Sequence, residues 1–419
     1  MNILLITDNF YPRKGGIAHA LNSLCKSFHN KEHKLYVINP YYKEKRIFNI
    51  IDNKDYNLKE IFKSIKKKKF WYYTFHSIYK ILVNDNIKLF HRINLILYLF
   101  EKPKLLFSTI NNINKISPIV RKLNIDIILS GHCGNILPLS FILSKSLNTK
   151  IIAIAHGLDF MIQSYFSLKT FYLKNLDKII VTNNRNKYFI KKIHELDEKK
   201  IAVIYLGLIT HEYEINETKA QLRKKFDISP DSFVLLSVGR HTPRKKFDLV
   251  IRAIYEIIKL KPELKIKYYL IGEGPITQEL KLLTKKLNLD KYVNFLGYCD
   301  HLKRNKYYKL SDLFLMPSIV MKNSFEGFGI VFLEANYFKL PVIGAYSGGV
   351  VEAIIDGKTG FLIKPNNLND LVEKISFLYK NKKEREIIGE NGYKRVLIDF
   401  NWDYLINEYV NLFKNVLNS

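Results

Sequence analysis

The stretch SFEGFGIVFLEANYFKLPVIG (residues 324–344) shows the pattern from which the fold can be predicted. It opens with a glycine-rich segment and continues with an apolar run at 330–338 that starts a helix. It ends in an apolar strand predicted at 340–345. Loop, helix and buried strand in this order are typical of an α/β protein. Two acidic residues, Glu326 and Glu334, stand within this one unit.

The same alternation of apolar strands and helical segments continues along most of the chain. In the first half we expect strands at 2–7, 34–39, 126–130, 150–155, 178–182 and 201–206. In the second half we expect them at 232–239, 265–272, 292–297, 313–318, 340–345 and 360–363. These runs are apolar nearly throughout, as parallel strands buried on both faces should be.

This alternation predicts two doubly wound, Rossmann-like α/β domains with a cleft between them. Their expected bounds are 1–210 and 211–400, because the polar stretch at 211–231 is a natural linker. The amphipathic helix predicted at 402–417 is a candidate to pack back on the first domain.

Composition narrows the class of protein. The 419 residues, 47% of them hydrophobic, can bury two cores, and the three widely spaced cysteines indicate neither disulfides nor a metal site. We expect no secretory signal and no membrane-spanning segment, since the apolar runs are far shorter than roughly 20 residues. A cytoplasmic location is therefore expected.

The charge is strongly positive and unevenly distributed. The net charge is +28, and residues 1–210 hold 34 Lys/Arg against 14 Asp/Glu, whereas residues 211–419 hold 33 against 25. Codon bias toward lysine is one explanation of the total but not of the depleted acids in the first half. An anionic partner is the other: a membrane surface, a nucleic acid or a phosphorylated substrate.

The region at 51–107 interrupts the α/β pattern. Within it, IKKKKFWYYTFHSIYKILV (65–83) interleaves basic and aromatic residues at helical spacing. Such a segment suits the interface of an anionic bilayer. It is equally typical of a solvated helix end followed by core aromatics.

The segment around Glu326 and Glu334 indicates a ligand that carries both phosphates and hydroxyls. Gly327 and Gly329 allow backbone amides to approach a ligand closely, and a helix N-terminus attracts phosphate. Ionised carboxylates accept hydrogen bonds from hydroxyls. A nucleotide sugar has both kinds of group.

A second stretch, LLSVGRHTPRKKFDLVIRA (235–253), supplies positive charge. Gly239 ends a predicted strand, and Arg240 and Lys245 follow in the turn to a helix, where ligands of such sheets bind. Two cations can neutralise a departing nucleoside diphosphate without a divalent metal.

The second half resembles the retaining GT-B glycosyltransferases that share an E-x7-E motif (glycosyltransferase family four). The matching pieces are VGRHTPRKKFD, LIGEGP, EGFGIVFLEA, PVIGAYSGGVVEAI and DGKTGFLI, which are collinear over about 233–364. The resemblance implies that Arg240 and Lys245 hold the donor diphosphate. It also implies that Glu326 faces the transferred sugar, that Glu334 faces the ribose, and that the backbone of Gly327, Phe328 and Gly329 touches sugar and phosphates.

The first half resembles the family more loosely. YPRKGGIAHAL (11–21) is similar to its glycine loop, which implies that Gly15 and Gly16 approach the phosphates and the acceptor. AHGLD (155–159) is similar to its His-Gly-x-Asp motif, which implies that His156 lies near the reacting sugar. The family usually has Asn-Gly-Val before the linker, and here the sequence is LGL (206–208).

The resemblance implies a hexosyl transfer with retention, in which the leaving phosphate takes the acceptor's proton. No Asp-x-Asp motif is visible, so we expect no metal and no other cofactor beyond the nucleotide-sugar donor. The acceptor could be a lipid-linked oligosaccharide, a glycolipid or a soluble sugar. The basic first half favours a lipid-linked acceptor at the inner face of the cytoplasmic membrane, as in surface polysaccharide or lipopolysaccharide assembly.

Three other classes of protein were compared with this prediction. A nucleotide-sugar epimerase or hydrolase on the same fold would need no acceptor. A nucleic-acid-binding protein would explain the charge, but no recognised module of that kind is visible. A dinucleotide oxidoreductase is disfavoured because DNFYPRKGG, not Gly-x-Gly-x-x-Gly, follows the first strand.

Overall fold

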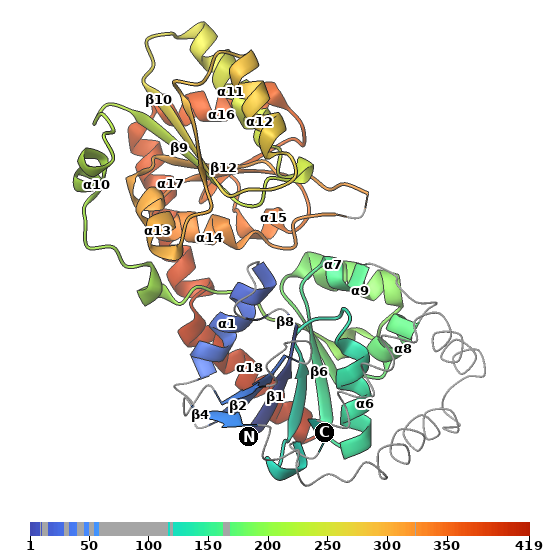
Figure 1. Cartoon of the computed structure of the whole chain (residues 1–419). Coiled ribbons are helices and arrows are strands. Elements are labelled where there is room, and N and C mark those ends of the chain that lie inside the picture. Colours follow the sequence, from blue (N-terminus) through green and yellow to red (C-terminus); the bar gives the residue numbers. More distant parts are fainter. Residues whose placement is uncertain are drawn as a thin grey trace. The chain divides into compact units, whose positions relative to one another are not determined.

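The structure is a computed structural model that describes residues 1–8, 10, 16–28, 33–39, 46–49, 54–57, 116–117, 120–161, 168–322 and 324–419. It consists of two compact units, residues 1–205 with 403–419 and residues 206–402. Each unit contains a β-sheet of its own (Figure 1).

The sheet of the first unit has eight strands in the order β4-β3-β2-β1-β5-β6-β7-β8. They are β1 (Asn2–Ile6), β2 (Lys34–Ile38), β3 (Arg46–Asn49), β4 (Lys54–Asn57), β5 (Ile127–Ser130), β6 (Lys150–Ala155), β7 (Lys178–Val181) and β8 (Ile201–Val203). Six pair in parallel, and β3 and β4 add an antiparallel edge. The sequence analysis did not predict this edge, because RIFN and KDYN are too short and polar to stand out.

The helices described in the first unit are α1 (Gly16–Phe28), α6 (Leu137–Leu147), α7 (Leu158–Met161), α8 (Leu168–Lys174), α9 (Asn184–His194) and the 3₁₀ turn η2 (Glu198–Lys200). The last helix, α18 (Trp402–Leu417), belongs to this unit from Asp403 onward. The rings of Phe413 in α18 and Phe28 in α1 are stacked with their centroids 6.1 Å apart. This contact joins the two ends of the chain in one core.

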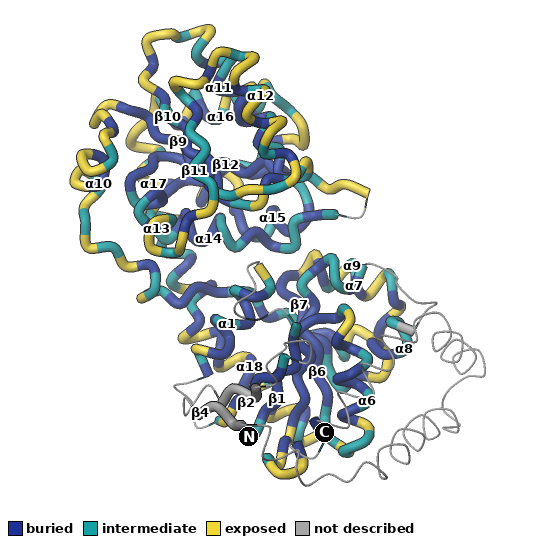
Figure 2. Tube along the Cα trace, viewed as in Figure 1, coloured by how far each residue is buried: buried dark blue, intermediate teal, exposed yellow. Residues whose placement is uncertain are grey.

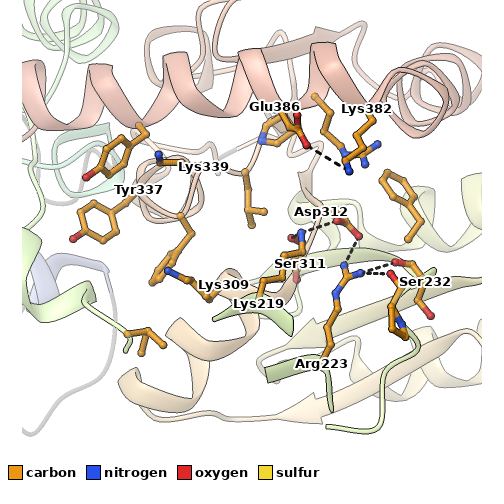
Figure 3. A pocket seen from close by; sticks show the side chains of 18 of the residues that line it. Lys219, Arg223, Ser232, Lys309, Ser311, Asp312, Tyr337, Lys339, Lys382 and Glu386 are labelled. Atoms are coloured by element: carbon orange, nitrogen blue, oxygen red, sulfur yellow. Dashed lines mark hydrogen bonds and ion pairs between the residues drawn. The ribbon is translucent and has the colours of Figure 1, made fainter. Parts of the chain in front are cut away.

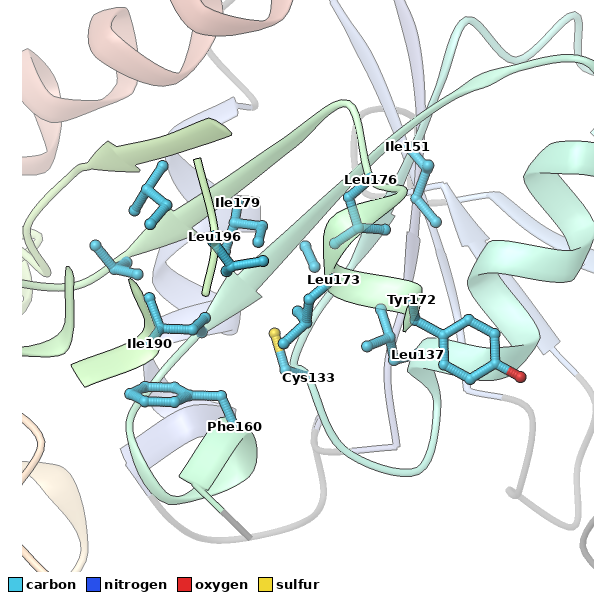
Figure 4. Close-up of a cluster of buried hydrophobic side chains, with 14 of the residues drawn as sticks. Cys133, Leu137, Ile151, Phe160, Tyr172, Leu173, Leu176, Ile179, Ile190 and Leu196 are labelled. Carbon is cyan, nitrogen blue, oxygen red and sulfur yellow. The ribbon is translucent and has the colours of Figure 1, made fainter. Parts of the chain in front are cut away.

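A large part of the first unit's core lies between β6, β7 and the helices that follow them (Figure 4). Its fully buried members include Ile151, Phe160, Leu173 and Ile190. Cys133 belongs to the same cluster, and all three cysteines are buried and free.

The sheet of the second unit has six parallel strands in the order β11-β10-β9-β12-β13-β14. They are β9 (Phe233–Val238), β10 (Ile266–Ile271), β11 (Val293–Gly297), β12 (Leu313–Met316), β13 (Val342–Ala345) and β14 (Gly360–Ile363). All of β9, β12 and β13 is buried, because these central strands are covered on both faces (Figure 2). Every strand expected from the sequence is present in the two sheets.

The helices of the second unit are α10 (Lys219–Lys225), α11 (Phe247–Leu260), α12 (Thr277–Lys286), α13 (His301–Leu310), α14 (Ile330–Tyr337), α15 (Val350–Ala353), α16 (Leu368–Lys380) and α17 (Lys382–Asp399). Two 3₁₀ turns, η3 (Thr210–Tyr213) and η4 (Pro243–Lys245), complete it. Across the described part of the chain, no helix combines the length and the apolar character that crossing a membrane requires. The basic, aromatic stretch at 65–83 lies outside the described residues.

The strand order of each sheet changes direction once. In the first unit the change lies between β1 and β5, and in the second unit between β9 and β12. Open α/β sheets bind their ligands outside the carboxyl ends of the strands at such a point. In the second unit, the loops that follow β9 and β12 lie at this point.

Candidate functional site

The loop after β9 places two of the predicted cations differently. Gly239 follows β9 with φ +154°, and Arg240 beside it is exposed. The chain then turns through η4, so that Lys245 folds back and its residue is only 8% exposed. A Cβ on Gly239 would lie 3.6 Å from Lys245 Cε. Gly239 therefore lies directly beside the buried lysine.

Two glycines after β10 allow the neighbouring loop to approach closely. A Cβ on Gly272 would stand 2.1 Å from the carbonyl oxygen of Gly239, and one on Gly274 would stand 2.3 Å from that of His241. No side chain fits in either place, and Gly272 has φ +122° in addition. The piece LIGEGP is thus required for packing the loop that holds the cations.

Glu326, in the loop after β12, reaches across the switch point to the loop after β9. Arg244 Nη1 donates to Glu326 Oε2 at 2.7 Å, and Lys245 Nζ donates to the same oxygen. Burial alone would raise the pKa of Glu326, but Lys245 and Arg244 outweigh it and the pKa falls to about 2. The carboxylate is therefore ionised at neutral pH.

The backbone of Glu326 is fixed by the glycines that follow β13. The N–H of Gly349 donates to the carbonyl oxygen of Glu326 at 2.8 Å. A Cβ on Gly348 would stand 2.8 Å from the same oxygen, and Gly348 has φ +56°. Glycine is the residue that tolerates both conditions. The piece YSGGV thus fixes the backbone position from which the Glu326 side chain extends.

The glycine-rich segment after Glu326 leads into α14. Gly329, the residue before the helix, has φ +87°, a conformation suited to glycine. Gly327 is half-buried, whereas Phe328 is buried and its ring packs against Phe400 at a centroid distance of 5.6 Å. The predicted contacts of this segment with a donor remain predictions.

Glu334 lies inside α14 and is 2% exposed. Its Oε1 accepts from Tyr213 Oη and from Arg304 Nη2, each at 3.1 Å. Its Oε2 accepts from Tyr308 Oη at 2.8 Å. Burial and the Glu334 carboxylate raise the pKa of the Tyr308 hydroxyl, which keeps this phenol a donor. The structure thus surrounds Glu334 with protein donors, and its contact with ribose remains a prediction.

His156, predicted to lie near the reacting sugar, follows β6 in the first unit. Its backbone N–H and that of Gly157 donate to Asp159 Oδ1, at 2.9 and 2.8 Å. Its Nε2 lies 2.9 Å from the carbonyl oxygen of Gly131, so Nε2 holds the proton and Nδ1 is left as an acceptor. Burial lowers the pKa of His156. Gly16 begins α1 in the same unit, and Gly15 lies outside the described residues.

The sequence analysis missed two groups. Arg244 was not selected, although it directly precedes Lys245. In the first unit, His132 Nε2 lies 2.5 Å from Asp8 Oδ1, and Gly134 N–H donates to His132 Nδ1 at 2.9 Å. Asp8 follows β1 and His132 follows β5, so this pair stands at that sheet's switch point. Polar residues directly after adjacent strands would have been the signal.

A cavity of about 890 Å³ lies at the opposite, amino edge of the second sheet (Figure 3). Asp312, which precedes β12, binds Lys219 through Oδ1 and Arg223 through Oδ2, each at 2.6 Å. Burial raises the pKa of Asp312, but Lys219 and Arg223 reverse this and the pKa is lowered. These charges are paired with one another.

Among the groups at the carboxyl edge of the second sheet, Arg240 is exposed and Lys245 has Glu326 as its anionic partner. Two cations, Arg244 and Lys245, contact one carboxylate there, and Arg240 lies in the same loop. Such a group can bind a phosphorylated ligand, and Glu326 can accept hydrogen bonds from hydroxyls of that ligand.

Comparison with known proteins identifies the family of the chain. The sequence profile of the family described as glycosyl transferases group 1 matches residues 218–395. An uncharacterized glycosyltransferase of Methanocaldococcus jannaschii, MJ1178, is 30% identical over 290 residues, which are 68% of this chain and 74% of that protein.

Solved structures agree on the fold. A glycosyltransferase from Rickettsia africae superposes with a TM-score of 0.73 at 20% identity, covering 100% of this chain and 99% of that one. Anabaena Alr3699/HepE, in complex with UDP and glucose, gives 0.70 at 16% identity, covering 99% and 100%. The chain therefore belongs to the group 1 glycosyltransferases and has their GT-B fold.

Proposed function

We propose that this glycosyltransferase transfers a hexosyl group, with retention, from a nucleoside-diphosphate sugar to a hydroxyl of a glycan or lipid-linked acceptor. The observation that carries the proposal is the group of Arg240, Arg244, Lys245 and Glu326 at the β9/β12 switch point. It combines cations suited to a diphosphate with a carboxylate suited to sugar hydroxyls.

In the proposed reaction the acceptor oxygen bonds to the anomeric carbon on the face from which the diphosphate departs. The bond between that carbon and the phosphate oxygen breaks, and the leaving phosphate takes the acceptor's proton. Arg240 and Lys245 stabilise the charge that develops on the diphosphate, and Glu326 orients the sugar. Because cations of the chain neutralise the leaving group, we propose that no divalent metal is required.

His156 is proposed to accept a hydrogen bond from the transferred sugar through Nδ1. Its lowered pKa supports this role, since burial favours the neutral imidazole and only the neutral ring has an acceptor nitrogen. Gly15, Gly16 and Gly239 are proposed to bring backbone amides close to the donor. Glu334 is proposed to face the ribose. A ribose hydroxyl would then replace one of the two tyrosine hydroxyls that donate to its carboxylate.

The acceptor side of the proposal rests on charge. Residues 1–210 carry 34 Lys/Arg against 14 Asp/Glu, which favours an acceptor held at an anionic surface. We therefore place the enzyme in surface polysaccharide or glycolipid biosynthesis, peripheral to the inner face of the cytoplasmic membrane.

The experiment that tests the donor site is a thermal-shift screen in EDTA against UDP, GDP, ADP and their sugar conjugates. A ligand that binds only the native state stabilises it by about 2.7 kcal/mol when its concentration is 100 times Kd. We expect one nucleotide family to raise the melting temperature of the wild-type protein. A Lys245→Ala protein should lose most of this shift, and a Lys285→Ala protein, changed at an exposed lysine, should keep it.

Absence of any shift at millimolar nucleotide would contradict the donor assignment. With the donor found, NMR of the product separates the remaining outcomes: an α-linked product from an α-linked donor supports retention, and an inverted linkage contradicts it. Release of free sugar in the presence of every acceptor tried would indicate a hydrolase instead. Sedimentation with anionic vesicles at low salt is expected, and its absence would contradict the membrane placement.

A further inference from the structure

Arg244 shares one carboxylate oxygen with Lys245. Arg244 Nη1 lies 2.7 Å from Glu326 Oε2, and Lys245 Nζ contacts the same atom. The side chains of Arg244 and Glu326 are each 15% exposed, and that of Lys245 is 10% exposed. Among the described residues, Glu326 Oε1 has no hydrogen-bond donor. The two cations thus share one oxygen atom, and neither donates a hydrogen bond to the other oxygen.

Sharing one oxygen matters because Lys245 has a second proposed partner. When a diphosphate arrives, Lys245 must weaken its bond to Glu326 in order to bind phosphate oxygens. An ionised carboxylate as buried as that of Glu326 is unstable without a neighbouring cation. If Lys245 were its only cation, loss of Lys245 would favour protonation or displacement of Glu326. With Arg244 in place, Glu326 keeps a cation after Lys245 has turned away.

The position of Arg244 is built into the backbone. Arg244 is the middle residue of the turn η4, and its carbonyl oxygen accepts from the N–H of Ile319 at 2.9 Å. Ile319 belongs to the loop that leads from β12 to Glu326. The loop after β9 and the loop after β12 are therefore tied together at this residue, which directs the guanidinium at Glu326.

We propose that Arg244 is a positioning residue of the donor site: it keeps Glu326 ionised and in place while Lys245 passes from Glu326 to the donor diphosphate. This inference rests on the proposed function. It assigns Arg244 an action on Glu326 and no direct contact with the phosphates. The net charge of Arg240, Arg244, Lys245 and Glu326 is positive throughout the exchange, which favours binding of a diphosphate dianion.

A double-mutant cycle tests the inference, with the affinity for UDP, GDP or ADP, whichever binds the wild type, measured by calorimetry. The variants are Arg244→Gln, Glu326→Gln and their combination, with Arg252→Gln, an exposed arginine on α11, as the control. Without Arg244, Glu326 holds Lys245 more strongly, so Arg244→Gln should weaken nucleotide binding by about tenfold. Glu326→Gln releases Lys245 and should tighten binding, and adding Arg244→Gln to it should change nothing further.

The other outcomes of the cycle are equally definite. Equal weakening by Arg244→Gln in both backgrounds would overturn the inference, because Arg244 would then bind the phosphates itself. No weakening in either background would show that Arg244 does not act on the site. A wild-type protein that binds none of the three nucleotides would contradict the proposed function itself, which separates the two failures.

A second measurement guards against misfolding. Arg244→Lys keeps a cation near Glu326 and should restore most of the affinity that Arg244→Gln loses. In Arg244→Gln the pKa of Glu326 should rise, because Arg244 is one of the two groups that lower it. The acid limb of kcat against pH should therefore shift upward relative to the wild type, which a purely structural role would not cause. An unshifted profile would contradict the inference.

Discussion

Two carboxylates stand at the opposite ends of β12, and each binds two cations in a different way. At the amino end, Asp312 uses both oxygens, one for Lys219 and one for Arg223, and also accepts from the N–H of Val234 at 2.7 Å. At the carboxyl end, Glu326 receives Arg244 and Lys245 on a single oxygen. The first carboxylate is saturated and the second is not.

The cations differ in the same sense. Arg223 commits its other donors to backbone carbonyls: Nε to Leu310 at 3.0 Å, and Nη1 to Pro230 at 2.9 Å and Ser232 at 3.1 Å. These hydrogen bonds form when the chain folds, and with Nη2 bound to Asp312 they give each side-chain nitrogen of Arg223 an acceptor within the protein. The ammonium of Lys245, in contrast, donates only to Glu326 and to the sulfur of Met316 among the described residues.

An ion pair that stabilises the fold can therefore be distinguished from one that is available to a ligand. Where every donor and acceptor is matched, an exchange would cost hydrogen bonds that nothing replaces. Where two cations share one oxygen, a second anion can take one of them at little cost. Asp312 is on this criterion structural, and Glu326 is available for function.

The largest effect is expected at the saturated site. Asp312→Ala leaves Arg223 buried without its counterion, and removing one partner of a buried pair costs about 3–5 kcal/mol. Urea unfolding should show this loss in the free energy of unfolding, whereas Asp290→Ala, at an exposed aspartate, should change it little. If Asp312→Ala were as stable as the control, the contrast between the two ends of β12 would disappear.

The next effect should appear in turnover and not in stability. Lys245→Ala removes a cation from the leaving diphosphate, and kcat should fall on the order of 10²-fold or more. Glu326 keeps Arg244, so the melting temperature without ligand should change little. Lys285→Ala, measured in the same assay, serves as the control. A large loss of stability with normal turnover would assign Lys245 to the fold.

A smaller effect is expected at the other cation of Asp312, Lys219. The side chain of Lys219 is 42% exposed, so water replaces much of what its ion pair with Asp312 provides. Lys219→Ala should therefore lower the free energy of unfolding by no more than about 1 kcal/mol, with unchanged turnover. Urea unfolding compared with Asp312→Ala checks this. Equal losses for the two variants would mean that Lys219, and not Arg223, holds Asp312.

Much of the fold could be predicted from the sequence because parallel strands have a local signature. Runs such as 150–155 and 360–363 are apolar and short, and they appear as β6 and β14 with the same bounds. The antiparallel strands β3 and β4 could not be predicted in this way, because their stability comes from pairing with β2 and with each other. A strand of four residues is too short for its pairing to produce a recognisable sequence pattern.

The candidate site divides along the same line. Strand, glycine and polar residue in succession predicted that Gly239, Arg240 and Lys245 lie in the turn from a strand to a helix, and they do. Glu326 was expected shortly before a helix, and α14 begins at Ile330. Arg244 was missed because the loop contains several basic residues that the sequence alone does not distinguish. Its selection depends on a side-chain contact between residues 82 positions apart. The hydrogen bonds that Tyr213 and Tyr308 donate to Glu334 could not be predicted from the sequence either.

The alternation of strands and helices, the glycines at the turns and the types of side chain in each loop follow from the sequence alone. These features are local, since they depend on side-chain periodicity and on backbone conformations that glycine alone tolerates. Tertiary contacts set the rest: β12 lies beside β9, Asp312 before β12 has a cation on each oxygen, and Glu326 in the loop after β12 has two cations on one oxygen. Contacts of this kind form between distant parts of the chain when the sheet assembles, and burial then fixes which charges pair.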